Sequence, residues 1–174
     1  EYLQGAPVYV RVIDQAANQS PSGVDSTSVE LASEVTGDLE SLTLTETGLD
    51  TGVFEGSMDT LFGTATSFDG VLDTNEDHQQ PFWWDVFFAT YTDAYGQSSA
   101  SARAIGSRVA FIDSAGQPAS SYATGGTAWV RVEDQNANDP AVLEAVMLNL
   151  SSDTGDNFDH YLWETGKSTG IFSA

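Results

Sequence analysis

The chain carries an internal repeat, and this feature constrains its fold more than any other. Residues 8–14 read Val-Tyr-Val-Arg-Val-Ile-Asp, and residues 128–134 read Ala-Trp-Val-Arg-Val-Glu-Asp, an offset of 120 residues. Three further blocks match at an offset of 118 residues: 36–38 with 154–156, 46–48 with 164–166, and 51–54 with 169–172. Matching blocks in the same order indicate two copies of one structural unit, since the units of a repeat array fold alike.

The pattern within the repeat predicts β-structure throughout. Apolar residues alternate along 8–13, which is the period of a half-buried strand. Gly, Asp, Asn and Ser punctuate the chain between further expected strands around 29–31, 42–44 and 86–91. The segment 141–150 has a helix-like composition, but its repeat partner is rich in Ser, Thr and Val. We therefore predict a strand in this segment as well.

Many short strands separated by turn signals are typical of antiparallel β-sandwiches. We predict an all-β fold of immunoglobulin-like antiparallel β-sandwiches in tandem. Residues 1–105 are expected to form a repeat that lacks its first strand. Residues 106–174 are expected to form the N-terminal part of the next repeat, so that the second sandwich is incomplete. Incomplete sandwiches expose strand edges, and strands donated by neighbouring copies can cover them.

The acidity of the chain restricts its partners. Its formal net charge is −21, from 26 Asp and Glu against 5 Lys and Arg. Phosphate neutralisation needs a basic surface, so nucleic acid is excluded as a partner. No apolar run approaches the ~20 residues that span a bilayer, and we predict no direct membrane insertion. The self-repulsion must be offset, for which bound cations and high external salt are the two candidates.

Oxygen-bearing side chains follow the repeated strand in both copies. Residues 134–139 read Asp-Gln-Asn-Ala-Asn-Asp, and residues 14–18 read Asp-Gln-Ala-Ala-Asn. Such loops supply several of the 6–8 oxygen ligands that Ca²⁺ takes, and Glu residues of the Glu-Thr-Gly blocks are candidates to close the sites. The alternatives are Asx turns for the loops and a structural β-turn for the Glu blocks. The candidate calcium ligands are Asp14, Asn18, Asp25, Glu46, Asp134, Asn136, Asn138, Asp139 and Glu164.

Three other features have competing interpretations. The acidic segment 69–77 is either a metal-binding loop or a solvated hairpin tip. Trp83 and Trp84 are adjacent on an expected strand and point to opposite faces, so one of them is a candidate for stacking on a sugar. Burial of both indoles is the alternative. The Asp-Thr-Gly segments at 50–52 and 153–155 do not align in the repeat, as an aspartic-protease dyad requires, and we predict no enzymatic activity.

Two strings in the first copy carry a family resemblance. They are Tyr-Val-Arg-Val-x-Asp-x-x-x-Asn at 9–18 and Leu-Thr-Leu-Thr-Glu-Thr-Gly-x-x-Thr-Gly-Val-Phe at 42–54. The chain resembles the immunoglobulin-like tandem repeats of large bacterial extracellular proteins, including adhesins, surface-layer components and matrix fibres.

The resemblance implies a structural role without catalysis, outside the cell or on the surface of a bacterium or archaeon. Relatives often read Asp-x-Asp-x-Asn in the acidic loop. Here Asn136 replaces the middle acid in the second copy and Ala16 removes it in the first. Expected partners are neighbouring copies of the chain or adjacent repeats. The alternative is an adhesin module that binds glycans or another surface.

Overall fold

The computed structural model describes residues 1–75, 84–139 and 141–174. The chain divides into two compact units, Glu1–Ile105 (unit 1) and Gly106–Ala174 (unit 2). Every regular element within the described residues is a β-strand, which confirms the all-β prediction. In this part of the chain no helix has the length and apolarity needed to cross a membrane.

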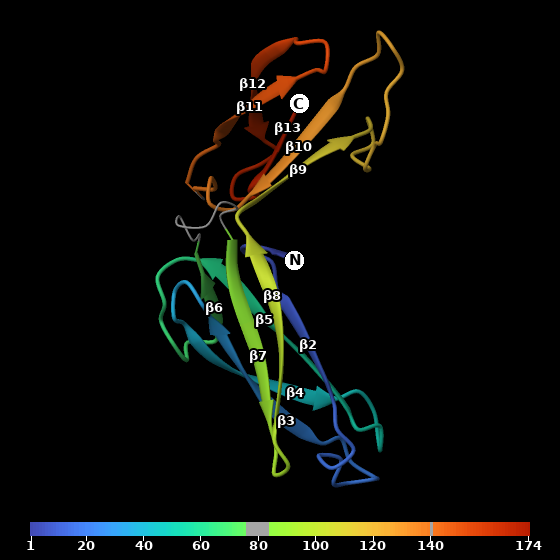
Figure 1. Ribbon diagram of the computed structural model, residues 1–174, viewed down its shortest axis with the longest axis vertical. Helices are drawn as coiled ribbons and strands as arrows, with labels where there is room; N and C mark the ends of the chain where they lie inside the picture. Colours follow the sequence, from blue (N-terminus) through green and yellow to red (C-terminus); the bar gives the residue numbers. More distant parts are fainter. Residues whose placement is uncertain (76–83, 140) are drawn as a thin grey trace. The chain divides into compact units, whose positions relative to one another are not determined.

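Unit 1 is built on one continuous sheet (Figure 1). The strands follow the order β1-β8-β7-β3-β4-β5-β2, and β6 pairs with β5. The β1–β8 and β5–β6 pairs are parallel, and the other pairs are antiparallel. Its strands are β1 (Tyr2–Leu3), β2 (Val8–Ile13), β3 (Ser26–Ser33), β4 (Leu39–Glu46), β5 (Val53–Phe62), β6 (Val71–Thr74), β7 (Trp84–Thr92) and β8 (Gln97–Ile105).

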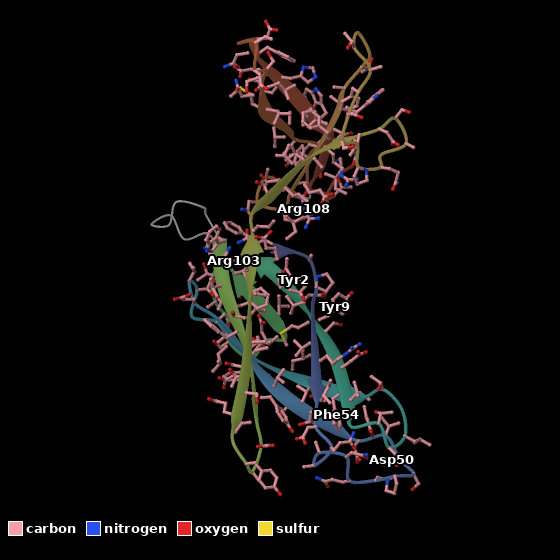
Figure 2. The ribbon with its side chains drawn as sticks, turned by 45° about the vertical axis from the view of Figure 1, so that its right-hand side comes forward. Tyr2, Tyr9, Asp50, Phe54, Arg103 and Arg108 are labelled. Carbon is pink, nitrogen blue, oxygen red and sulfur yellow. The ribbon has the colours of Figure 1, made fainter. Side chains whose placement is uncertain are left out.

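The sheet of unit 1 closes over a single apolar core. Alternation along β4 buries Leu42 and Leu44, and β5 adds the fully buried Phe54 (Figure 2). The same cluster also contains buried residues of β2, β3, β6, β7 and β8. Strands from both ends of the sheet order therefore share one core, as a β-sandwich requires.

Unit 2 has a smaller antiparallel sheet with the order β11-β12-β13-β10-β9. Its core cluster is Val130, Val132, Leu162 and Phe172. The segment 141–150, which has a helix-like composition, forms a strand from residue 145 onward as predicted, whereas residues 141–144 precede the strand. The strands are β9 (Ser107–Ile112), β10 (Trp129–Asp134), β11 (Ala145–Ser151), β12 (Asn157–Glu164) and β13 (Ile171–Ser173).

The sequence repeat is also a repeat of strand pairing. In unit 1, β2 pairs antiparallel with β5, placing Val12 opposite Phe54. In unit 2, β10 pairs antiparallel with β13, placing Val132 opposite Phe172. The β3–β4 hairpin likewise returns as β11–β12. The matched sequence blocks therefore encode the same ladder twice.

Candidate functional site

Glu46, the last residue of β4, organises the turn that follows this strand. Its Oε1 accepts hydrogen bonds from the backbone amides of Thr51 (2.6 Å) and Gly52 (2.8 Å). In unit 2, Glu164 accepts the matching bonds, 2.7 and 2.9 Å long, from the counterparts of these two residues. Glu46 and Glu164 are both buried, so each carboxylate replaces water as the acceptor for the turn. One carboxylate oxygen of each glutamate therefore has the structural role in a β-turn that the sequence analysis gave as the alternative to calcium binding.

These hydrogen bonds lower the pKa values of both glutamates. The Gly52 amide is the main cause for Glu46, ahead of the opposing effect of burial. For Glu164, burial is the largest single effect and raises the pKa, but hydrogen bonds with Gly170, Thr169 and the Glu144 side chain together lower the pKa below its usual value. Both side chains are therefore carboxylates at neutral pH.

The first aspartate of each loop forms an Asx turn. Asp14 Oδ1 accepts the Ala16 amide at 2.7 Å, and Asp134 Oδ1 accepts the Asn136 amide at 3.0 Å. The other oxygen of Asp14 accepts the Tyr91 hydroxyl at 2.7 Å. The Tyr91 hydroxyl, followed by the Ala16 amide, holds the pKa of Asp14 below its usual value. The Asx-turn alternative thus accounts for at least one oxygen of each aspartate.

The remaining unit 1 candidates also bind within their own loops. Asp25 Oδ2 accepts the amides of Gln19 (2.6 Å) and Ser20 (2.7 Å). Asn18 Nδ2 donates to Asp50 Oδ1 at 2.8 Å, joining the loop after β2 to the loop after β4. Both loops lie at the same end of unit 1 (Figures 1 and 2). The structure therefore brings these candidates together at one end of unit 1. Most of their polar side-chain atoms are already hydrogen-bonded to other groups of the protein.

Sequence reasoning missed one acidic residue of the second loop. The Glu46 amide donates to the Asp25 carbonyl, and the Glu164 amide donates to the Glu144 carbonyl. Glu144 is therefore the counterpart of Asp25. Its Oε1 accepts the Asp139 amide at 2.8 Å. The offset between the two residues is 119, which matches neither the 120 nor the 118 of the flanking blocks, so aligning those blocks did not reveal it.

Three side chains of unit 2 each have a buried oxygen atom for which the described residues provide no hydrogen-bond donor. They are Asn138 Oδ1, Glu144 Oε2 and Glu164 Oε2. The Glu144 and Glu164 carboxyl groups interact with each other, and Glu164 is only 7% exposed. A buried carboxylate oxygen without a donor is costly unless a cation or a proton satisfies it. Among the corresponding loop residues of unit 1, only Asn18 Oδ1 is in this position.

These free oxygen atoms make unit 2 better suited than unit 1 to bind a hard cation. Carboxylate and amide oxygens are the ligands that Ca²⁺ prefers. Within the described residues, however, no three Asp, Glu or His side chains lie close enough to form a metal cluster by themselves. A cation bound there would also need oxygens from amide side chains, backbone carbonyls or water.

A second group of buried carboxylates lies in unit 1. The sequence analysis gave a solvated hairpin tip as one interpretation of the acidic segment 69–77. That interpretation is wrong for β6, because Asp73 and its strand neighbours are buried. Residues 76–77 fall outside the described residues. Asp38 is fully buried. Its Oδ2 accepts the Asp73 amide at 2.7 Å, but its Oδ1 has no donor. Burial raises the pKa of Asp73; the Thr66 amide opposes this, and the neighbouring carboxylates add to it.

The two tryptophans give the glycan hypothesis no support. Trp83 lies outside the described residues. Trp84 is half-buried at the start of β7, and the Arg103 guanidinium carbon lies 4.2 Å from the centroid of its ring (Figure 2). A guanidinium over the ring is a favourable cation–π contact and occupies one face of the indole.

Comparison with known proteins gives no assignment. No protein-family model matches the chain. No curated protein matches it either. A function is therefore proposed from the geometry of the two loops and from the family resemblance of the sequence.

Proposed function

We propose that the chain is a structural module of an extracellular tandem-repeat rod or filament of a bacterium or archaeon. The observation that carries this proposal is one loop network that recurs in two consecutive units. Each copy joins the end of β2 or β10 to the turn after β4 or β12. The bonds from Asp14 N to the Gly52 carbonyl and from Asp134 N to the Gly170 carbonyl, each 2.8 Å, illustrate the recurrence.

The chemistry of the network suits a structural role. Its carboxylates mainly accept hydrogen bonds from backbone amides and neighbouring hydroxyls, and so fix the conformation of the loops. Gln15 and Gln135 add further bonds, to the Thr51 and Thr169 carbonyls at 2.8 and 3.0 Å. The resemblance to repeats of adhesins, surface layers and matrix fibres and the all-β architecture support immunoglobulin-like sandwiches in series. Neighbouring copies are the proposed partners.

Calcium is the proposed stabilising ion, bound in unit 2. Asn138, Glu144 and Glu164 would hold it, because each of them offers a buried oxygen without a donor. The ion would supply positive charge that offsets the carboxylate repulsion there and in the chain as a whole. Unit 1 would bind more weakly, since Glu46 Oε2 already accepts the Asp25 amide at 3.2 Å.

Thermal unfolding of the full chain tests the calcium proposal. We expect millimolar calcium to raise the Tm above its value in chelator at matched ionic strength, because an ion that binds only the folded state stabilises it. Glu144→Gln should remove most of this rise. Asp153→Asn removes the same charge from an exposed turn of unit 2 and should preserve the rise.

Two outcomes would count against this proposal. An equal calcium response in Glu144→Gln and Asp153→Asn would leave only non-specific screening. Absence of any calcium response in the unmodified chain would remove the ion from the proposal altogether. The rod itself is tested on longer arrays of the repeat. We expect mechanical and hydrodynamic measurements to show rigid arrays. Arrays that behave as units joined by flexible linkers would contradict the rod.

A further inference from the structure

Outside the loop network, unit 1 buries four acidic residues that have no basic partner among the described residues. Each of them is at most 4% exposed: Asp38, Glu40, Asp73 and Asp85. The ion pairs in this part of the chain use two other acids, Glu55 and Glu133. A buried carboxylate is costly unless hydrogen bonds, an opposite charge or a metal ion replace the water that it has lost.

Two of these four acids are satisfied by hydrogen bonds. Glu40 accepts one backbone amide on each oxygen, both at 3.0 Å. Asp85 accepts one donor on Oδ1 and two donors on Oδ2, at distances between 2.6 and 3.1 Å. Every carboxylate oxygen of Glu40 and Asp85 therefore has a donor.

The other two acids are neighbours, and each has one oxygen without a donor. Asp38 Oδ2 accepts the Asp73 amide at 2.7 Å, whereas Asp38 Oδ1 is buried and has no hydrogen-bond partner. Asp73 Oδ2 accepts the Thr66 amide at 3.0 Å, and this is the one hydrogen bond to the Asp73 carboxylate from the residues that the structure describes. A Cβ on Gly63 would lie 3.3 Å from Asp73 Oδ1, so this oxygen lies against the main chain of residue 63.

The charge around this pair is entirely negative. Burial is the main cause of the raised pKa of Asp73, and the charges of Asp38, Asp69 and Glu40 add to it, against the Thr66 amide. Of these three charges, Asp38 has the largest effect. The two carboxyl groups are therefore close enough to repel each other. A bound cation would turn this repulsion into attraction.

We propose that Asp38 and Asp73 bind a calcium ion in unit 1, at a site separate from the loop network. Each carboxylate would contribute its Oδ1, and the two negative charges would match the charge of the ion. No three acidic side chains in the described part of the chain form a metal cluster, so main-chain carbonyls or water would complete the coordination. The ion would fasten β6 to the connection between β3 and β4, and it assigns the metal-binding interpretation of segment 69–77 to Asp73.

A shared proton is the competing way to satisfy this pair. A proton between the two carboxyl groups would remove one negative charge, whereas calcium balances both. An amide has the shape of a protonated acid, so Asp73→Asn mimics the protonated pair but loses a charged ligand for the ion. Calcium binding by this variant therefore separates the two explanations.

Counting the calcium ions bound to the full chain tests the proposal. Equilibrium dialysis at pH 7 is carried out in the Glu144→Gln background, which removes a ligand of the proposed unit 2 ion. We expect Asp73→Asn to lower the number of bound ions by one in this background. Asp59→Asn removes the same charge from an exposed position of β5 and should leave the number unchanged.

Asp38→Asn provides a second variant at the same site. Its amide keeps one oxygen as acceptor for the Asp73 amide and puts an NH₂ group in place of a carboxylate oxygen. We expect it to lose the same ion as Asp73→Asn does.

A second readout must be local to unit 1, because unit 2 has the smaller core, should unfold first and should determine the Tm. Hydrogen exchange of the Thr66 and Asp73 amides meets this need, since these amides donate to the two carboxylates. Calcium at ten times its Kd should slow their exchange about tenfold, because the ion must leave before the site opens. Asp73→Asn should abolish this slowing, and Asp59→Asn should retain it.

Three results would overturn the proposal. An unchanged calcium count in Asp73→Asn would remove the site. Equal slowing of exchange by calcium in Asp73→Asn and Asp59→Asn would leave only non-specific screening. A higher stability of Asp73→Asn in calcium as well as in chelator would assign the pair to a shared proton. The effect of Glu144→Gln on the calcium count of the unmodified chain reports separately on the unit 2 ion, so the two proposals can fail independently.

Discussion

At the scale of single residues, buried carboxylates serve this chain chiefly as acceptors for its own backbone. Asp85 is fully buried and accepts the Ser33 hydroxyl at 2.6 Å and the amides of Val35 and Asn75, each at 3.1 Å. Glu40 accepts two consecutive amides, of residues 69 and 70, at 3.0 Å. Charge-assisted bonds of this kind fix loops that have no strand pairing of their own.

Asp73 is the exception, because its surroundings disfavour its charge. Burial is the main cause of its raised pKa. An acid whose pKa is raised by folding binds protons more readily in the folded state. Its contribution to the free energy of unfolding therefore falls as the pH rises from about 3.8 through the raised pKa, and a penalty is left at neutral pH.

We therefore predict that Asp73→Asn raises the free energy of unfolding at pH 7 by on the order of 1 kcal/mol. The gain should shrink as the pH falls towards 4, because the raised pKa makes the native carboxyl take up its proton at a higher pH than an ordinary aspartate does. Urea unfolding between pH 7 and pH 4 measures both effects. Asp59→Asn, an exposed change on β5, is the matched control and should have little effect. A loss of stability in Asp73→Asn at pH 7 would show instead that the charge is required.

At the scale of elements, the turn after β4 and β12 needs a particular backbone. Gly52 and Gly170 have φ values of 61° and 58°, in the left-handed region that favours glycine. A Cβ on Gly52 would also overlap the amide of Gln15, and one on Gly170 would lie 2.5 Å from the Gln135 Nε2. A side chain in this turn would therefore strain the backbone, and would also displace the glutamine from its hydrogen bond to the Thr51 or Thr169 carbonyl.

Gly52→Ala should lower the free energy of unfolding by more than Gly37→Ala does. Gly37 also has a positive φ, 72°, but a Cβ there meets no atom within 4 Å. The backbone cost of about 1–2 kcal/mol applies to both variants, whereas displacement of Gln15 applies only to the first. Chemical denaturation of both variants and of Gly52→Ala/Gln15→Ala measures the difference. The double variant should approach Gly37→Ala if the overlap with Gln15 causes the excess.

At the scale of the whole molecule, acidic charge opposes folding. In the described residues, ion pairs involve three arginines: Arg11 with Glu55, and Arg108 and Arg131 with Glu133. They neutralise little of a net charge of −21. Exposed ion pairs contribute at most about 1 kcal/mol each, so the remaining repulsion must be screened or bound by ions.

Monovalent salt should therefore raise the Tm of the full chain. Between 0.05 and 0.5 M the Debye length falls from about 14 Å to about 4 Å, which weakens repulsion between exposed carboxylates. Differential scanning calorimetry in potassium chloride with chelator isolates this effect from calcium. A Tm that is flat or falls over this range would mean that long-range repulsion does not limit stability.

The sequence by itself determined the repeat, the all-β class, the presence of a strand within 141–150 and the polar loops after β2 and β10. These properties follow from periodicity and turn chemistry, which act over a few residues and can be compared between two copies. Only the tertiary structure revealed Glu144 as the counterpart of Asp25 and the contact of Asp38 with Asp73. Each of these depends on strands that meet although they are distant in sequence, and no local pattern specifies which pairs will meet.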